Sequence, residues 1–166
     1  RFDEYCIQNI LNPLRMDNSY FVIPEKEQYR LVDVYQPNSE NVRLEPAIYS
    51  YTTYPIIESR QFFSAGADLC STAEDYSKFV QAIANGGVLN NNRILGEEYV
   101  KLMLTKQSPL SEDDSYQGFA AWIVNEKGAQ KGPMGIGSYG FGGFFDTYSW
   151  CDPDKGLVAV LLLQMY

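Results

Sequence analysis

A chain of 166 residues with 45% hydrophobic and 14% aromatic residues is long and apolar enough to bury one core, so residues 1–166 are expected to form a single domain. The formal net charge of −8, with no run of basic residues, argues against nucleic acid or an anionic membrane surface as a partner. No apolar run reaches the roughly 20 residues that a membrane-spanning helix needs.

The first part of the chain predicts a helix followed by a long irregular region. Apolar residues recur at helical spacing over Phe2–Leu11, and Pro13 ends this helix near Asn12. A polar turn then leads to the apolar run Tyr20–Ile23. Prolines interrupt any period over Glu25–Arg60, so we expect an ordered, irregular excursion with short strands, of a length that is often functional.

The clearest helix lies in the middle of the chain. Ser71 or Thr72 is its expected N-cap, and Gly86-Gly87 ends it. Glu74 and Asp75 stand in its first turn. We interpret these acids as capping-box residues at the positive end of the helix dipole rather than as a catalytic carboxylate pair.

A tight asparagine-rich hairpin or loop over Val88–Leu95 separates this helix from a shorter one. The shorter helix is expected from Glu97 to about Leu104. Its apolar residues Tyr99, Leu102 and Met103 are expected to point inward.

The last third of the chain predicts antiparallel strands. We expect a strand over Gly118–Val124, a polar turn over Asn125–Gly132 and a long strand over Tyr139–Cys151. A turn at Asp152–Gly156 then leads to the strand Leu157–Leu163, which is apolar enough to be buried on both faces. The order of elements predicts an α+β fold, in which helices cover an antiparallel sheet.

Four glycines fall between Gly137 and Gly143, at the beginning of the predicted long strand. Glycine weakens a strand interior, so such residues mark either a bulge or a close approach of the backbone to a ligand. From the glycines alone, we favour a bulged edge strand without a ligand.

Histidine is absent, which excludes a Ser-His-Asp or Cys-His arrangement within this chain and removes the commonest zinc ligand. Cys6, Cys70 and Cys151 are far apart and odd in number, so they match neither a metal motif nor a disulfide framework. We expect three buried or half-buried thiols, no metal and no cofactor.

Three stretches of the chain carry a family resemblance: "SAGADLCSTAEDYSKFVQAIANGGVLNNNRIL", "EEYVKLM" and "GSYGFGGFFDTYSWCDPDKGLVAVLLLQ". Together they resemble the superfamily of the serine β-lactamases, penicillin-binding proteins and related family VIII-type esterases. The first two are similar to its middle part, and the third is similar to its active-site strand and the neighbouring strand. The opening "FDEYCIQNILNPLRMDNSYF" resembles the helix and turn after its central motif. The resemblance is weak only over Glu25–Phe62. It implies the C-terminal portion of a β-lactamase/transpeptidase-like fold.

This superfamily needs a Ser-x-x-Lys nucleophile motif, a Tyr-x-Asn or Ser-x-Asn motif and a Lys-Thr-Gly-like strand. We find no suitable Ser-x-x-Lys and no fitting Tyr-x-Asn in residues 1–166. The resemblance therefore implies a fragment that lacks the nucleophile and is inactive alone. It also suggests an exported protein, periplasmic or extracellular, although the sequence itself fixes no compartment.

The third motif is expected within the glycine-rich strand. The match places Ser138-Tyr139-Gly140 at the Lys-Thr-Gly position, while the following Phe-Gly-Gly resembles the Trp-Gly-Gly of the esterase-like branch. Ser138 brings no cation for a substrate carboxylate, which favours a small ester, amide or peptide over a β-lactam. The resemblance implies an oxyanion-hole donor in the backbone N–H of Phe141. It implies substrate contacts from Ser138, Tyr139, Gly140, Gly142 and Gly143.

Two other interpretations stay open at this point. One is a β-lactamase-like binding module without catalysis, for example for a cell-wall peptide. The other is an unrelated α+β interaction domain whose glycine strand is only structural. A fragment would also leave apolar surface and a sheet edge uncovered, so we expect either the missing N-terminal segment of the same protein or a second copy as its partner.

Overall fold

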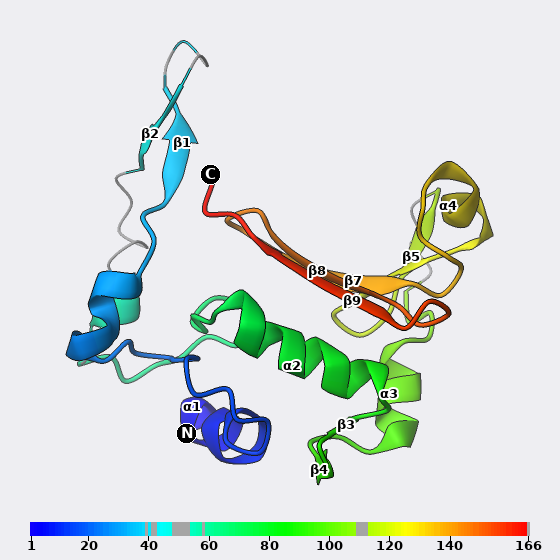
Figure 1. Ribbon diagram of the computed structural model, residues 1–166, viewed down its shortest axis with the longest axis horizontal. Helices are drawn as coiled ribbons and strands as arrows, with labels where there is room; N and C mark the ends of the chain where they lie inside the picture. Colours follow the sequence, from blue (N-terminus) through cyan, green and yellow to red (C-terminus); the bar gives the residue numbers. More distant parts are fainter. Residues whose placement is uncertain (39, 41–42, 48–53, 58, 109–112, 166) are drawn as a thin grey trace.

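The structure is a computed structural model, and it describes residues 1–38, 40, 43–47, 54–57, 59–108 and 113–165. Its centre is a five-stranded antiparallel sheet in the order β5-β6-β7-β8-β9, with helix α2 packed against one face (Figure 1). The strands are β5 Ser115–Gln117, β6 Trp122–Val124, β7 Tyr139–Gly143, β8 Thr147–Asp152 and β9 Leu157–Leu162. The α+β fold class with an antiparallel sheet is confirmed.

The predicted first helix is confirmed, but it changes type along its length. Helix α1 (Phe2–Cys6) continues directly into the π-helix η1 (Ile7–Leu11). The N–H of Asn12 closes the last turn by donating to the carbonyl of Ile7, five residues back, at 2.9 Å. Pro13 follows, and it has no N–H with which to extend the helix.

Short strands in an irregular excursion are confirmed for the described part of residues 25–60, whereas residues 39, 41–42, 48–53 and 58 lie outside the described residues. It contains the 3₁₀-helices η2 (Glu25–Arg30) and η4 (Tyr54–Ile56). Between them, β1 (Tyr35–Pro37) and β2 (Leu44–Pro46) form a two-stranded hairpin that stands away from the main sheet (Figure 1).

Helix α2 (Ala73–Ala84) begins as predicted, because the side chain of Thr72 accepts the N–H of Asp75 at 3.2 Å. The capping-box role predicted for Asp75 is wrong. Its buried carboxylate turns away from the helix end and accepts the N–H of Asn18 and the hydroxyl of Ser19. The short strands β3 (Val88–Leu89) and β4 (Asn92–Arg93) form the predicted hairpin.

Helix α3 (Glu97–Met103) has the predicted position but a different buried side. Val100 is its buried residue, whereas Tyr99 and Leu102 are 58% and 50% exposed, so their predicted inward orientation is wrong. The side that packs on the core is Val100, Met103 and Leu104, which is also an i, i+3, i+4 set. Apolar residues thus lie on two sides of this helix, and the side with Val100 is the one that packs on the core.

Two predictions before the glycine-rich strand need correction. Residues 118–121 form a turn rather than a strand, closed by the N–H of Gly118 donating to the carbonyl of Ala121 at 2.8 Å. The predicted polar turn is the helix α4 (Glu126–Lys131). Asn125 caps this helix by accepting the N–H of Gly128 at 3.0 Å.

The predicted long strand Tyr139–Cys151 is two strands, β7 and β8, joined by residues 144–146. Asp146 takes the positive φ of 55° that the third residue of such a three-residue hairpin loop requires. Strand β9 is not buried on both faces as predicted, because Leu157 and Leu161 are 49% and 46% exposed. Among the described residues, helix α2 covers one face of this sheet.

Two hydrophobic clusters hold these elements together. The first lies between α2 and the sheet and consists of Val80, Ile83, Val100, Ile123, Tyr139 and Cys151. The second joins the N-terminal turn to the other side of α2 and consists of Leu11, Leu14, Met16, Phe21, Phe63 and Ala82. Helix α2 is therefore the element that both clusters share. In the described part of the chain, no helix has the length and apolarity to cross a membrane.

Candidate functional site

Strand β7 has two neighbours along only part of its length. It pairs with β8 from Tyr139 to Gly143, but with β6 only at Tyr139 and Gly140. On the side away from β8, no described strand pairs with Phe141, Gly142 or Gly143. The second half of β7 is therefore an open strand edge.

The register shows which backbone groups face that edge. The carbonyl of Ser138 accepts the N–H of Val124 at 2.7 Å, so the backbone of Ser138 faces β6. Backbone groups alternate sides along a strand, so Gly140 and Gly142 face the same way. The backbone of Phe141 faces β8, opposite Ser149. This register does not support Phe141 as the oxyanion-hole donor, and it directs the N–H of Gly142 to the open edge instead.

The side chains of Tyr139 and Phe141 face α2. The Phe141 ring lies 6.4 Å from the Phe79 ring and 6.3 Å from the Tyr139 ring, measured between centroids. Burial raises the pKa of the Tyr139 phenol, and the neighbouring Cys151 raises it further. Tyr139 and Ser138 are both buried, so neither side chain is exposed in the described structure, and their contact with a substrate stays a prediction.

The three glycines of β7 have different surroundings. A Cβ on Gly140 would lie 2.2 Å from the indole of Trp122, and one on Gly143 would lie 2.1 Å from the hydroxyl of Thr147. A Cβ on Gly142 would meet only the Tyr148 ring, at 3.6 Å. Packing against the Trp122 ring and the Ser149 carbonyl therefore accounts for Gly140. Gly143 is exposed, and its close contact is with the hydroxyl of Thr147, whereas Gly142 has free space for a Cβ.

Beyond Gly143, the loop of residues 144–146 carries Phe144, which is 69% exposed. The carbonyl of Phe145 accepts the N–H of Met165 at 3.2 Å, and Met165 forms a bridge with Tyr35 of β1. The loop that follows β7 thus contacts Met165, which in turn lies beside Tyr35.

A network around Asp75 fixes the N-terminal end of α2. Lys78 donates both to Asp75 and to the carbonyl of Arg15, at 2.6 Å each. The hydroxyl of Ser19 lies 2.7 Å from that of Ser71. The carboxylate of Asp75 thus has hydrogen-bond partners within the fold. This agrees with the interpretation that Glu74 and Asp75 do not form a catalytic pair.

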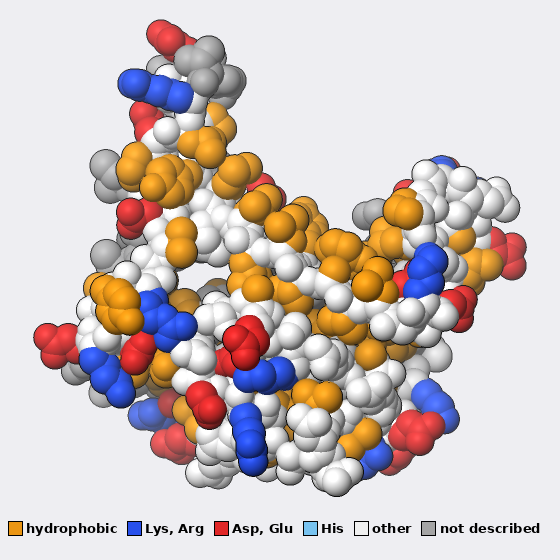
Figure 2. Space-filling view, in the orientation of Figure 1, with side chains coloured by type: hydrophobic (Ala, Val, Ile, Leu, Met, Phe, Trp, Pro, Cys, Tyr) orange, Lys and Arg blue, Asp and Glu red, His pale blue; other side chains and the backbone are white. Residues whose placement is uncertain are grey.

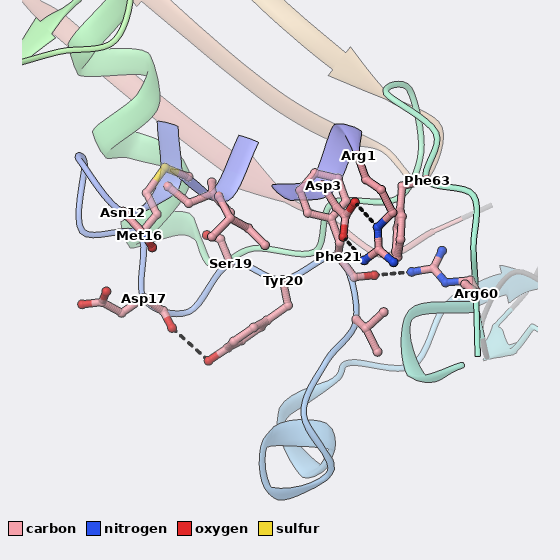
Figure 3. Close-up of a pocket in the computed structure, with 13 residues that line it drawn as sticks. Arg1, Asp3, Asn12, Met16, Asp17, Ser19, Tyr20, Phe21, Arg60 and Phe63 are labelled. Atoms are coloured by element: carbon pink, nitrogen blue, oxygen red, sulfur yellow. Dashed lines mark hydrogen bonds and ion pairs between the residues drawn. The ribbon is translucent and has the colours of Figure 1, made fainter. Parts of the chain in front are cut away.

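A separate cavity of 490 Å³ lies between the N-terminal helix and residues 60–63 (Figure 3). Arg1 pairs with Asp3 at 2.7 Å on one side of it. On the other side, Arg60 donates to the carbonyl of Phe21 and pairs with the buried Asp68. The residues that line the cavity include none from β7, β8 or β9, so it lies apart from the expected active-site strand.

The sequence did not reveal the Arg60–Asp68 pair, since no motif links two residues in irregular segments. The described residues also contain no group of three or more cysteine, aspartate or glutamate side chains that could hold a metal ion. The three cysteines are free, with Cys151 buried and the other two half-buried, as expected.

This chain is similar in sequence and in structure to several known proteins. Protein Rv1367c of Mycobacterium tuberculosis (strain ATCC 25618 / H37Rv) is 26% identical over 171 residues, which cover 95% of this chain and 42% of that protein. The unliganded simvastatin synthase LovD of Aspergillus terreus has a TM-score of 0.81 at 21% identity, over 99% of this chain and 45% of that one. EstCE1, a hydrolase with promiscuous acyltransferase activity, has a TM-score of 0.77 at 17% identity. The match covers 98% of this chain and 45% of EstCE1.

The two structural likenesses show the fold, a β-lactamase/transpeptidase-like one. The chain spans less than half the length of the first curated relatives that it matches. The family model described as Beta-lactamase matches residues 1–165, which covers nearly the whole chain. This excludes an unrelated interaction domain: the chain belongs to the beta-lactamase family.

Proposed function

We propose that this chain forms one wall of the acyl-transfer site of a serine hydrolase that acts on an ester or an amide. The family match supports the class of enzyme. The observation that carries the site is the open edge of β7, where no described strand pairs with Gly142 on the side that its N–H faces.

The chemistry needs parts that residues 1–166 do not supply. A serine hydroxyl attacks the substrate carbonyl while a base takes its proton, and the carbonyl oxygen becomes an oxyanion. Collapse of this intermediate expels the alcohol or amine with that proton and leaves an acyl-serine, which water then hydrolyses. Serine, lysine and tyrosine for these steps belong to a segment outside this chain.

The part that this chain supplies is the backbone donor. The N–H of Gly142 faces the open edge, so it replaces that of Phe141 as the proposed oxyanion donor. One such donor is typically worth about 3–4 kcal/mol of transition-state stabilisation.

The substrate is proposed to be neutral at the position where a penicillin carries its carboxylate. Residues 138–143, which are Ser138 and strand β7, include no lysine or arginine. No cation in this segment would therefore pair with a substrate carboxylate. Short esters, amides or peptides fit this surface better than β-lactams do.

Paired substitutions at Gly142 test the proposal in a longer polypeptide that joins a Ser-x-x-Lys segment to this chain. Gly142→Pro removes the N–H on the open side without removing a bond to β8, whereas Gly142→Ala keeps it. We expect kcat for p-nitrophenyl acetate to fall about 100-fold or more in Gly142→Pro relative to Gly142→Ala. Equal activity of the two variants would contradict the proposed donor.

Substrate preference gives a second test. The longer polypeptide should hydrolyse p-nitrophenyl acetate with a higher kcat/KM than nitrocefin, and a preference for nitrocefin would overturn the neutral-substrate proposal. The 166-residue chain alone should show no saturable turnover of either compound above buffer, because it has no nucleophile. Saturable turnover by the chain alone would contradict this division of roles.

A non-catalytic binding module of the same family is the alternative. The burial of Ser138 and Tyr139 favours it, since these two side chains are not exposed at the surface of the described structure. Two findings would support this alternative. The longer polypeptide would have no Ser-x-x-Lys motif, and mass spectrometry would detect no acyl-enzyme after incubation with p-nitrophenyl acetate.

A further inference from the structure

The C-cap of helix α2 is the one asparagine of the sequence that a glycine follows, in the pair Asn85-Gly86. Asn85 is exposed, and no described group forms a hydrogen bond with its side-chain amide. Figure 2 shows mostly polar side chains and backbone on the lower side of the molecule, where β3 and β4 follow α2, so water reaches this region. Glycine has no Cβ, so its backbone nitrogen can come closer to the preceding side chain than that of another residue. The pair therefore favours attack of the Gly86 nitrogen on the side-chain carbonyl of Asn85.

The folded backbone opposes this attack. At its ψ of 24°, Asn85 turns the Gly86 nitrogen away from its own Cβ. The N–H of Gly86 also donates to the carbonyl of Ile83 at 3.0 Å, and that of Gly87 donates to the carbonyl of Ala82 at 2.7 Å. Ring closure requires rotation about the Cα–C bond of Asn85, and this rotation breaks the bond to Ile83. The last turn of α2 must therefore open before the nitrogen can react.

We propose that Asn85 is a deamidation site and that opening of the last turn of α2 controls its conversion. The Gly86 nitrogen bonds to Cγ of Asn85 and gives up its proton, while the Cγ–Nδ2 bond breaks and Nδ2 leaves as ammonia. Water then opens the resulting succinimide ring at one of its two carbonyls, which gives aspartate or isoaspartate. Water is the only co-reactant, and the inference does not depend on the proposed catalysis.

Isoaspartate does not fit the packing at this end of the helix, because it lengthens the main chain before Gly86 by one methylene group. A Cβ on Gly87 would lie 2.1 Å from the carbonyl oxygen of Leu95, so the backbone has no room to move toward Leu95. Arg93 donates to the carbonyls of Gly86 and Leu95, at 2.8 and 2.9 Å. A longer main chain would displace these groups, whereas aspartate adds only a negative charge at the negative end of the helix dipole. Isoaspartate should therefore lower stability more than aspartate does.

Mass spectrometry with peptide mapping tests the site and its control by the fold. The chain is incubated at mildly alkaline pH, in buffer and in guanidinium chloride. We expect Asn85 to be the first residue converted in both, at a rate about 10-fold or more lower in buffer. Asn85→Gln should abolish this conversion. Earlier conversion of another asparagine in guanidinium chloride, or equal rates at Asn85 in the two solutions, would overturn the inference.

A pair of cation substitutions tests the role of the last turn. Arg93→Ala removes the bonds to the carbonyls of Gly86 and Leu95, whereas Lys106→Ala removes a positive charge from an exposed residue elsewhere. In buffer, Asn85 should convert about 3-fold or more faster in Arg93→Ala than in Lys106→Ala. In guanidinium chloride the two variants should convert at the same rate. Equal rates in buffer would contradict control by opening of this turn.

The products separate packing from charge. The isoaspartate form is purified from the aged chain by ion exchange and compared with Asn85→Asp, which has the same charge on a main chain of normal length. The isoaspartate form should have a Tm lower by about 3 °C or more. Equal Tm values for the two would overturn the inferred effect on the end of α2.

Discussion

The backbone N–H of Asn18 donates to the buried carboxylate of Asp75 at 2.7 Å, across 57 residues of sequence. The same carboxylate accepts the hydroxyl of Ser19 at 3.2 Å and the ammonium of Lys78 at 2.6 Å. One acid therefore holds the turn after the first helix against the beginning of α2, the helix that both hydrophobic clusters share.

Replacing Asp75 tests this role. Asp75→Ala should lower the free energy of unfolding by about 3 kcal/mol, because three donors lose a partner in a buried place. Glu74→Ala is the control, since Glu74 is exposed and should cost less than about 0.5 kcal/mol. Urea unfolding measures both changes. Equal effects of the two substitutions would show that Asp75 acts only as a first-turn acid.

Two glycines of β7 offer a contrast between packing and open space. In Gly140→Ala the new Cβ would lie 2.2 Å from the Trp122 ring and 2.5 Å from the carbonyl of Ser149, so backbone or ring must move. We expect a cost of about 1–3 kcal/mol for this overpacking. Gly142→Ala meets nothing closer than 3.6 Å and should be close to neutral. Thermal unfolding distinguishes them, and a larger loss in Gly142→Ala would contradict the described packing.

The sequence predicted the elements whose signals are local. The helix cap at Thr72, the asparagine turn at residues 90–91 and the helix break before Pro13 all depend on a few neighbouring residues. The fold class followed from their order and from the family resemblance. One of the failures was the hairpin at residues 144–146, because aspartate there takes the positive φ that a glycine usually signals.

The candidate site was predictable only to the level of its strand. The bond between the N–H of Val124 and the carbonyl of Ser138 sets the register of β7 against β6. A register shift of one residue would turn the N–H of Phe141, instead of that of Gly142, to the open edge. The burial of Tyr139 depends on α2 packing over β7, which no local pattern encodes. The glycine pattern marked the strand correctly, but it could not separate packing against Trp122 from space for a ligand.

The corrected orientation of α3 gives a third prediction. Val100→Ala should lower the free energy of unfolding by about 2 kcal/mol, since its side chain is buried between α3 and the core. Leu102→Ala removes more atoms but from a residue that is 50% exposed, so it should cost less than about 1 kcal/mol. Chemical denaturation of both variants measures the difference. A larger loss in Leu102→Ala would restore the orientation predicted from the sequence.

An ion pair in the turn between β8 and β9 should make the stability of the fold depend on pH in the acid range. Lys155 donates to the buried Asp152 at 2.6 Å, and the N–H groups of Gly135 and Lys155 add two more bonds at 3.2 Å. The bond from the Lys155 side chain, helped by these N–H groups, lowers the pKa of Asp152 to about 2. A carboxyl with a lowered pKa in the folded state stabilises above its unfolded pKa, and that contribution is lost as pH falls toward 2.

Asp152→Asn should therefore be less stable than the unsubstituted chain at neutral pH. Between about pH 4 and pH 2 its stability should fall less steeply, because the substituted residue no longer titrates. Asp154→Asn is the matched control, since it removes an exposed carboxylate from the same turn. Urea unfolding at several pH values gives these slopes. Parallel curves for Asp152→Asn and the unsubstituted chain would show that the ion pair with Lys155 does not contribute to folding in acid.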